Sequence, residues 1–271
     1  MSLEEGRAPV PAGNDGTIES IQDLLTRITE SRLADLSKSH LRLWFRGQPD
    51  SSWLLRPGVY RETFPEQEEI KRLQIERLMN QDFRVQSAAL IDGEKNDQEL
   101  YFLQQHYGLP TRLLDWTTNP LAALFFAVSE LTETEAALFM MDAYQLAVQQ
   151  RTGNEFLGVA TSRHPVFMEA LKPICEWSNS PLPEFIIPVR PNHFDRRMTL
   201  QRSGHTFHVP KRPELTKREN KTLRKFTIPS GREGAFARDL TRLGIDAYGV
   251  YGDLPNLART LRQAYGIKDR V

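Results

Sequence analysis

The chain of 271 residues is long enough to bury a sizeable core, as one large domain or two small ones. Its 35 basic side chains balance its 35 acidic ones, so it lacks the basic excess of a protein that coats DNA. The single cysteine, Cys175, excludes an internal disulfide and a cysteine-rich zinc site, and it fits the reducing environment of the cytoplasm, where we expect the protein to reside.

The N-terminal segment is polar and contains glycine and proline, so we expect residues 1–16 to form a disordered tail. It lacks the pattern of a signal peptide, and no apolar run in the sequence approaches the ~20 residues needed to span a membrane. Ordered structure should begin at Thr17, a candidate N-cap. The amphipathic helix that should follow has apolar residues at helical spacing, namely Ile21, Leu24, Leu25 and Ile28. We predict one domain over residues 17–271.

A short apolar segment from Leu41 to Phe45 predicts a strand that ends at Gly47. After a loop, a helix should begin at about Pro65. Its predicted buried face consists of Ile70, Leu73, Ile75, Leu78 and Met79. A further helix is expected over 97–107, because Gly108-Leu109-Pro110 is a strong termination signal.

Residues 111–116 should be extended, and Asn119-Pro120 should begin a helix that runs through Ser129. This helix is apolar on nearly every side, so we expect it to be central and buried. The remaining predicted strands are 136–141, 186–189, 206–209, 223–228 and 245–250, and the remaining helices are 234–243 and 254–265. The predicted fold class is therefore α+β, with a mixed, partly antiparallel sheet, a buried central helix and flanking helices.

Polar residues follow the first predicted strand at Arg46-Gly47-Gln48. A guanidinium at the end of a rigid strand is well placed to bind a phosphate or carboxylate, and glycine allows a backbone or a ligand to approach closely. The alternative is that Arg46 and Asp115 form a buried ion pair that only braces the fold.

A second candidate segment runs from His106 to Thr118, between two predicted helices. It presents an imidazole, an aromatic ring and several polar side chains just before a helix N-terminus that can attract an anion. Strand alternation places Arg112 and Leu114 on one face, and it places Thr111, Leu113 and Asp115 on the other. Trp116 is better explained as a core residue, and Thr117 and Asn119 can also be helix caps.

These two segments resemble the FRG domain family, a bacterial and phage family named after its Phe-Arg-Gly motif. The resemblance is carried by LWFRGQ at 43–48, QHYGLPTRLLDWT at 105–117 and NPLAALFFA at 119–127, and it covers about 38–145. It extends through Arg197, Gln201, Gly204 and Phe207 with one inserted residue, and to Gly252-Asp253-Leu254, where Gly252 replaces a proline. The resemblance implies a link to mobile elements and phage defence, and it implies no particular reaction.

We expect an enzyme that acts on NAD or a related nucleotide, because the order of elements is similar to that of ADP-ribosyltransferases. Arg46 would bind the pyrophosphate, Tyr107 would stack on a ring, and Asp115 would stabilise the oxocarbenium-like centre. The catalytic candidates are Asp115, Arg46 and His106, and the substrate-binding candidates are Gly47, Gln48, Tyr107, Thr111, Arg112, Thr117 and Gln201. The glutamate that such enzymes usually carry on a late strand is not identifiable, and Gln201 is the nearest polar candidate.

The alternative function is a non-enzymatic module that binds a nucleotide or a nucleic-acid end. Such a module would use Arg46, Arg112 and the basic segment 211–225, with aromatic stacking from Tyr107 or Trp53. The basic segment can equally be a solvated surface loop. A nuclease is disfavoured because the sequence offers no cluster of carboxylates for two metal ions, and we expect no bound metal.

Overall fold

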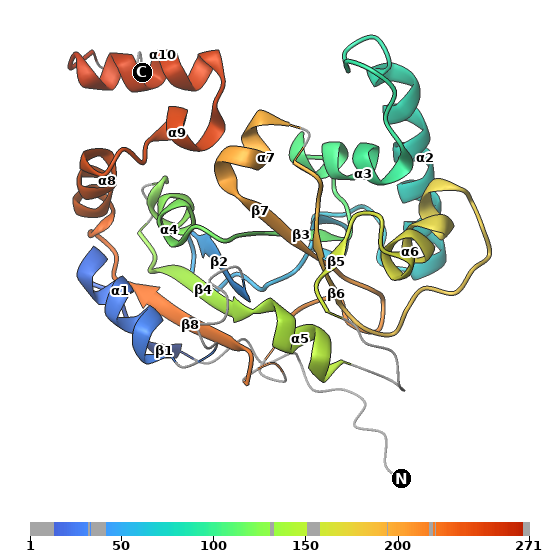
Figure 1. Cartoon of the computed structure of the whole chain (residues 1–271), viewed down its shortest axis with the longest axis horizontal. Coiled ribbons are helices and arrows are strands. Elements are labelled where there is room, and N and C mark those ends of the chain that lie inside the picture. The colour runs from blue at the N-terminus through green and yellow to red at the C-terminus, as the bar shows by residue number, and fades with distance from the viewer. Residues whose placement is uncertain are drawn as a thin grey trace.

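The computed structural model describes residues 14–31, 33, 42–130, 133–150, 158–193, 195–216, 219 and 221–267. Within these ranges, helices pack around one mixed sheet of eight strands (Figure 1). The predicted α+β class, with a mixed and largely antiparallel sheet, is confirmed.

The strands lie side by side in the order β1-β8-β4-β2-β3-β7-β6-β5. Their bounds are β1 Asn14–Thr17, β2 Leu43–Gln48, β3 Leu113–Thr117, β4 Ala136–Asp142, β5 Ala160–Thr161, β6 Ile187–Arg190, β7 Ser203–Phe207 and β8 Leu223–Ile228. The pairs β1–β8 and β5–β6 are parallel, and the other neighbours are antiparallel. Strands β2 and β3 therefore meet in the middle of the sheet.

The helices come from all parts of the chain that the structure describes. Their bounds are α1 Ile21–Glu30, α2 Glu69–Ser87, α3 Asp97–His106, α4 Pro120–Val128, α5 Ala143–Gln149, α6 Pro165–Cys175, α7 Arg196–Gln201, α8 Glu233–Arg242, α9 Ala247–Tyr251 and α10 Leu254–Ala264, with a 3-10 turn at Gly58–Tyr60. None of these described helices is both long enough and apolar enough to cross a membrane.

Helix α4 is the buried central helix that the sequence predicts. The Asn119 side chain caps it by accepting a hydrogen bond from the Leu121 amide, and Pro120 occupies its first turn. Its residue Leu124 is fully buried against Leu43 and Phe45 of β2, together with residues of α1 and α8. Trp44, between those two strand residues, packs on the opposite face of the sheet.

Helix α4 approaches β2 so closely that Gly47 has no room for a side chain. A Cβ atom at this position would lie 1.9 Å from the Ala123 carbonyl oxygen and 2.6 Å from the Ala127 amide nitrogen. Both are main-chain atoms, which cannot move aside by a change of rotamer. The glycine of the Phe-Arg-Gly motif is therefore required for packing of the helix on the sheet.

Helix α2 contradicts the prediction of its buried face. It begins at Glu69, not near Pro65, and Ile70 and Leu78 of the predicted apolar face are exposed. The buried side chains are polar instead, and they include Arg72, Glu76 and Asn80. Partners that are distant in sequence satisfy Glu76 and Asn80, whereas Arg72 bonds to Glu69 and Gln67 nearby. Asn80 Oδ1, for example, accepts a hydrogen bond of 2.7 Å from Gln104.

The N-terminal prediction is corrected as well. We expected a disordered tail over 1–16, but Asn14–Thr17 form β1, which pairs with β8; residues 1–13 lie outside the described ranges. Thr17 consequently belongs to a strand, and the N-cap of α1 is Ser20, whose side chain accepts a hydrogen bond from the Asp23 amide. The pairing with β8, which is distant in sequence, draws this short polar segment into the sheet.

The strand predicted over 245–250 is also wrong, because α9 occupies this segment. The Asp246 side chain caps the helix by accepting from the Gly249 amide at 2.7 Å, and Gly252 ends it with a φ of 72°. An aspartate before the apolar residues and a glycine after them are helix boundary signals. In this segment the boundary signals outweigh the β-branched residues, which favour a strand.

Candidate functional site

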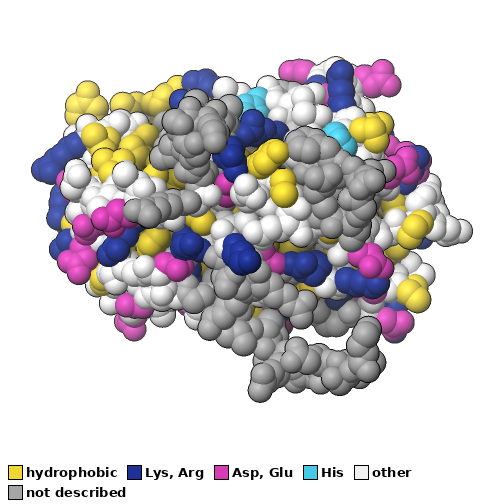
Figure 2. Space-filling view, turned by 60° about the horizontal axis from the view of Figure 1, so that its bottom comes forward, with side chains coloured by type: hydrophobic (Ala, Val, Ile, Leu, Met, Phe, Trp, Pro, Cys, Tyr) yellow, Lys and Arg dark blue, Asp and Glu magenta, His cyan; other side chains and the backbone are white. Residues whose placement is uncertain are grey.

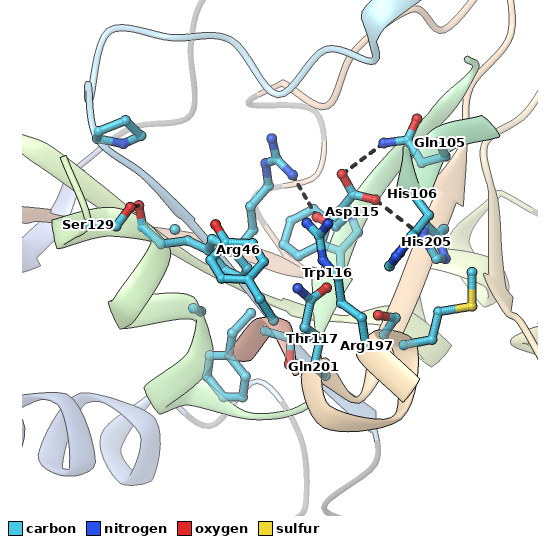
Figure 3. Close-up of a pocket in the computed structure, with 18 of the residues that line it drawn as sticks. Arg46, Gln105, His106, Asp115, Trp116, Thr117, Ser129, Arg197, Gln201 and His205 are labelled. Carbon is cyan, nitrogen blue, oxygen red and sulfur yellow. Dashed lines mark hydrogen bonds and ion pairs between the residues drawn. The ribbon is translucent and has the colours of Figure 1, made fainter. Parts of the chain in front are cut away.

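A pocket of about 280 Å³ opens where β2 and β3 separate in the middle of the sheet (Figure 3). The register joins these two strands at a single pair, Phe45 with Thr117. Beyond that pair, β2 stays with β4 and β3 stays with β7, so the sheet opens between them. Residues from α3, α4, α7 and α9 complete the walls, and the volume is near the lower end of the range for small-molecule sites.

The pocket brings together six of the residues that the sequence singled out. These are Arg46, Gly47, His106, Asp115, Thr117 and Gln201. The other four, Gln48, Tyr107, Thr111 and Arg112, do not line it. Residues of both motifs thus line one pocket, and Arg112 is not among them.

Asp115 lies at the centre of a hydrogen-bonded group in this pocket. It pairs across the sheet with His205 of β7, whose Nε2 lies 3.3 Å from Asp115 Oδ1, and Gln105 donates to Oδ2 at 2.8 Å. Burial alone would raise the pKa of Asp115, but the hydrogen bond and charge of His205, the charge of Arg46 and the Gln105 amide lower it to about 2. The carboxylate is therefore ionised at neutral pH, and 57% of the side chain is exposed.

Thr111 supports this group from outside the pocket. Its hydroxyl donates to Gln105 Oε1 at 2.6 Å, and this bond leaves the Gln105 amide nitrogen pointing to Asp115. Thr111 is buried, so the contact is not open to a ligand. Thr111 therefore positions the Asp115 carboxylate and does not bind substrate.

Arg46 reaches across the gap between the strands. Its Nη1 donates to the Asp115 carbonyl oxygen at 2.8 Å, a main-chain acceptor near the opening between the two strands (Figure 3). Burial lowers the pKa of Arg46 to about 10, so the guanidinium remains charged at neutral pH. Among the described residues it has no carboxylate within salt-bridge distance, so the ion pair with the Asp115 side chain, the alternative considered from the sequence, is not formed.

His106 ends α3 at the wall of the pocket, with its Nε2 3.5 Å from Asp195 Oδ1. Burial and the charge of Arg197 lower the pKa of His106 below its usual 6.5. The imidazole is therefore neutral at pH 7 and can accept a proton. Tyr107 contacts this ring edge-on but is 66% exposed outside the pocket.

Arg112 lies in a separate buried network below α2. Its guanidinium contacts both oxygens of Glu76 at about 3 Å and donates to Glu69 and Tyr60 at 2.7 Å each. Burial alone would lower the pKa of Arg112, but the Glu76 and Glu69 carboxylates raise it well above its usual value. Gln48 is also buried, with its amide 3.5 Å from the Leu54 carbonyl oxygen, and both residues are structural.

Several pocket residues escaped the sequence reasoning. Gln105, Arg197, His205 and Tyr251 line the site without having been candidates, and Phe126 adds aromatic surface. Trp53, which the sequence offered as a stacking residue of a binding module, also lines the pocket. Gln105 directly precedes His106 in the second motif, and Arg197 lies one helical turn before Gln201. The positions of these two residues beside named candidates could therefore have indicated them in the sequence. His205 and Tyr251 carried no local signal, because only the pairing of β7 with β3 and the packing of α9 bring them to the site.

The basic segment 211–225 forms contacts within the chain. Lys211 pairs with Glu184, Arg212 pairs with Glu219, and the Lys225 ammonium donates to the Ser51 carbonyl oxygen at 2.6 Å. Residues 217, 218 and 220 lie outside the described ranges. In the part of the chain that the structure describes, no group of three or more His, Cys, Asp or Glu side chains is arranged to hold a metal ion.

Residues 41–136 match the family model of the FRG domain. No curated protein and no solved structure matches the chain. The matched residues include Arg46, Gln105, His106 and Asp115. The pocket residues from α7, β7 and α9 lie outside the matched range, so the site is completed by a part of the chain that the family model does not cover.

Proposed function

We propose that this chain, which contains an FRG domain, is an enzyme that breaks the N-glycosidic bond of NAD or a related nucleotide. The observation that carries the proposal is the Asp115 carboxylate, which is ionised and open to a pocket that also holds the charged Arg46. An enzyme that consumes NAD would suit the role in phage defence or toxin action that is linked to this family.

The proposed step breaks the bond between the ribose C1′ and the nicotinamide nitrogen. The bonding electrons leave with the nicotinamide, so positive charge develops on the ribose, and the fixed Asp115 carboxylate stabilises it. A water molecule, or the hydroxyl of an acceptor in a transfer reaction, then adds to C1′. The neutral His106 accepts the proton that this oxygen loses.

Two features of the pocket would bind the substrate, namely a positive charge and an aromatic surface. Arg46 would bind the phosphates, and the aromatic wall of Phe126, Tyr251 and Trp53 would contact a base or the nicotinamide. This wall replaces Tyr107, which lies outside the pocket. The late strand β7 contains no glutamate, and it contributes His205 beside Asp115 instead.

The alternative function is a module that binds a nucleotide or a nucleic-acid end. It is supported by the presence of Trp53 and Arg46 in the same pocket. Arg112 is unavailable for it, because Glu76 and Glu69 occupy its guanidinium. On the face seen in Figure 2, Lys and Arg side chains are scattered among acidic and uncharged ones. Together with the balance of 35 basic and 35 acidic side chains in the whole sequence, this face favours a small nucleotide over a long nucleic acid.

The test is incubation of the purified protein with NAD, ATP and nucleic acid, followed by mass spectrometry. We expect NAD to be converted to ADP-ribose and nicotinamide, and Asp115→Asn to reduce the rate at least about 100-fold, because it removes the charge that stabilises the transition state. Asp239→Asn, which removes a surface carboxylate paired with Arg242, is the matched control and should retain the wild-type rate.

Two results of this experiment would contradict the proposal. Full activity in Asp115→Asn would remove the carboxylate from the mechanism. The absence of both NAD conversion and a thermal shift with NAD at millimolar concentration would contradict the NAD hypothesis. A thermal shift without conversion would favour the binding module.

The rate should also depend on pH through His106. Because the neutral imidazole is the active form, we expect kcat/KM to rise with pH and reach a plateau, with a midpoint below 6.5. Asp115, with its pKa near 2, adds no further change above pH 4. His106→Gln should remove this acidic limb, and His164→Asn, which changes the cap of α6, should keep it. An unchanged midpoint in His106→Gln would exclude His106 as the base.

A further inference from the structure

Arg197 is a second guanidinium in the pocket, and the sequence placed it in the extended family motif but not among the candidate site residues. It lies on α7, with its guanidinium 4.7 Å from the centre of the Tyr251 ring. In the described part of the chain it has no carboxylate within salt-bridge distance, and its Nε is buried without a hydrogen-bond partner. The amide nitrogen of Gln201, one turn further along α7 and also in the pocket, is likewise buried and unpartnered.

Arg42 and Arg72, which lie outside the pocket, also have a buried Nε without a partner, but carboxylates neutralise their guanidinium groups. Among the described residues, Arg197 lacks such a carboxylate. Elsewhere, arginines such as Arg56, Arg112 and Arg212 form salt bridges with carboxylates. Buried polar groups without partners cost free energy, and several of them around one cavity indicate a ligand that supplies the missing acceptors. The Nε of Arg46 is a further unpartnered donor in the same pocket.

The position of Arg197 is fixed by aromatic packing. Tyr251 contacts Phe125 and Phe126 of α4 edge-on, with ring centres about 6 Å apart, and its face supports the guanidinium. A cation fixed by stacking keeps its fork of donors free for a planar or tetrahedral anion. The Asp115 carboxylate is turned toward Gln105, which donates a hydrogen bond to it, and toward the Nε2 of His205 (Figure 3).

We propose that Arg197 and Gln201 form a second anion subsite beside Arg46, and that the substrate therefore carries a diphosphate. The inference rests on the proposed nucleotide site and narrows its substrate from nucleotides in general to those with a pyrophosphate link. It also assigns the second phosphate contact to a segment outside residues 41–136, so the matched domain alone would lack half of the subsite.

The test measures binding of inorganic pyrophosphate and orthophosphate by calorimetry, with EDTA present. The full chain should bind pyrophosphate more tightly than orthophosphate. Arg197→Ala should weaken pyrophosphate binding at least about tenfold, the loss expected when a charge-assisted hydrogen bond is removed, and should abolish the preference. Arg196→Ala is the matched control, because this neighbour stacks on Tyr248 outside the pocket and carries the same charge.

The outcomes separate this inference from the proposed function. If the protein binds pyrophosphate through Arg197 but does not convert NAD, the result supports the subsite and contradicts only the proposed cleavage of NAD. NAD conversion by an Arg197→Ala protein with unchanged KM and unchanged pyrophosphate binding would overturn the subsite alone. Equal losses in Arg196→Ala and Arg197→Ala would also overturn it, since they indicate general charge attraction. Should Arg197→Ala fail to fold, Arg197→Lys keeps the charge but removes the fork, and it should still lose the preference for pyrophosphate.

Discussion

Gly47→Ala should destabilise the protein by more than about 3 kcal/mol, beyond the usual cost of an overpacked core, and in a domain of ordinary stability this change can prevent folding. The reason is that the added Cβ would lie 1.9 Å from the Ala123 carbonyl oxygen. Relief requires α4 to move away from β2, which would expose Leu124 and other core residues. The measurement is urea unfolding of the purified variant, or its soluble yield if too little can be purified.

Gly234→Ala provides the matched control for this prediction. Gly234 lies in α8, where the nearest atom to an added Cβ is Arg238 Nη1 at 3.6 Å. Alanine is the better helix former by about 1 kcal/mol, so this variant should be as stable as the wild type or more so. If Gly47→Ala unfolds at the same urea concentration as Gly234→Ala, the close contact between α4 and β2 is wrong.

Arg112→Ala should cost about 3–5 kcal/mol, because it leaves Glu76 as a buried carboxylate without its main partner. Arg46→Ala should cost about 1 kcal/mol or less, because Arg46 donates only to a carbonyl oxygen at the edge of an open pocket. Both variants lose one arginine from the two motifs. Denaturation midpoints measured under identical conditions would therefore show which of the two supports the fold.

A double variant tests the cause of the larger effect. Arg112→Met combined with Glu76→Leu removes both charges and keeps most of the volume, so it should recover much of the stability that Arg112→Ala loses. Equal stability losses in Arg46→Ala and Arg112→Ala would contradict the division between pocket and scaffold. A double variant no more stable than Arg112→Ala would show that the cost comes from packing and not from the unpaired charge.

The structure gives each residue of the Phe-Arg-Gly motif a different task. Phe45 packs in the core against α4, Gly47 allows α4 to approach, and Arg46 faces the pocket with a free Nε. Substitutions at the outer two positions should therefore act on stability, whereas a substitution at Arg46 should act on ligand binding.

The sequence by itself determined those elements whose signals are local. Helix α3 follows a capping box between Asn96 and Glu99 and ends before Gly108, and α4 begins at its predicted cap. The predicted bounds of β8 are those observed. Caps, turn glycines and alternation act through residues within about one turn of each other, so they can be read from neighbouring letters. The sequence also named Arg46 and Asp115 as candidates, but only the pairing of β2 with β3 brings them together.

Only the tertiary structure decided which polar residues serve the pocket and which serve the core. Arg46 and Arg112 look alike in sequence, yet Arg112 is neutralised by Glu76 of α2, and α2 buries its polar face for that reason. His205 and Arg197 reach Asp115 and His106 because β7 pairs with β3, across about ninety residues of sequence. Burial and ion pairing depend on which groups meet in space, and neither hydrophobic periodicity nor a local motif encodes a partner that far along the chain.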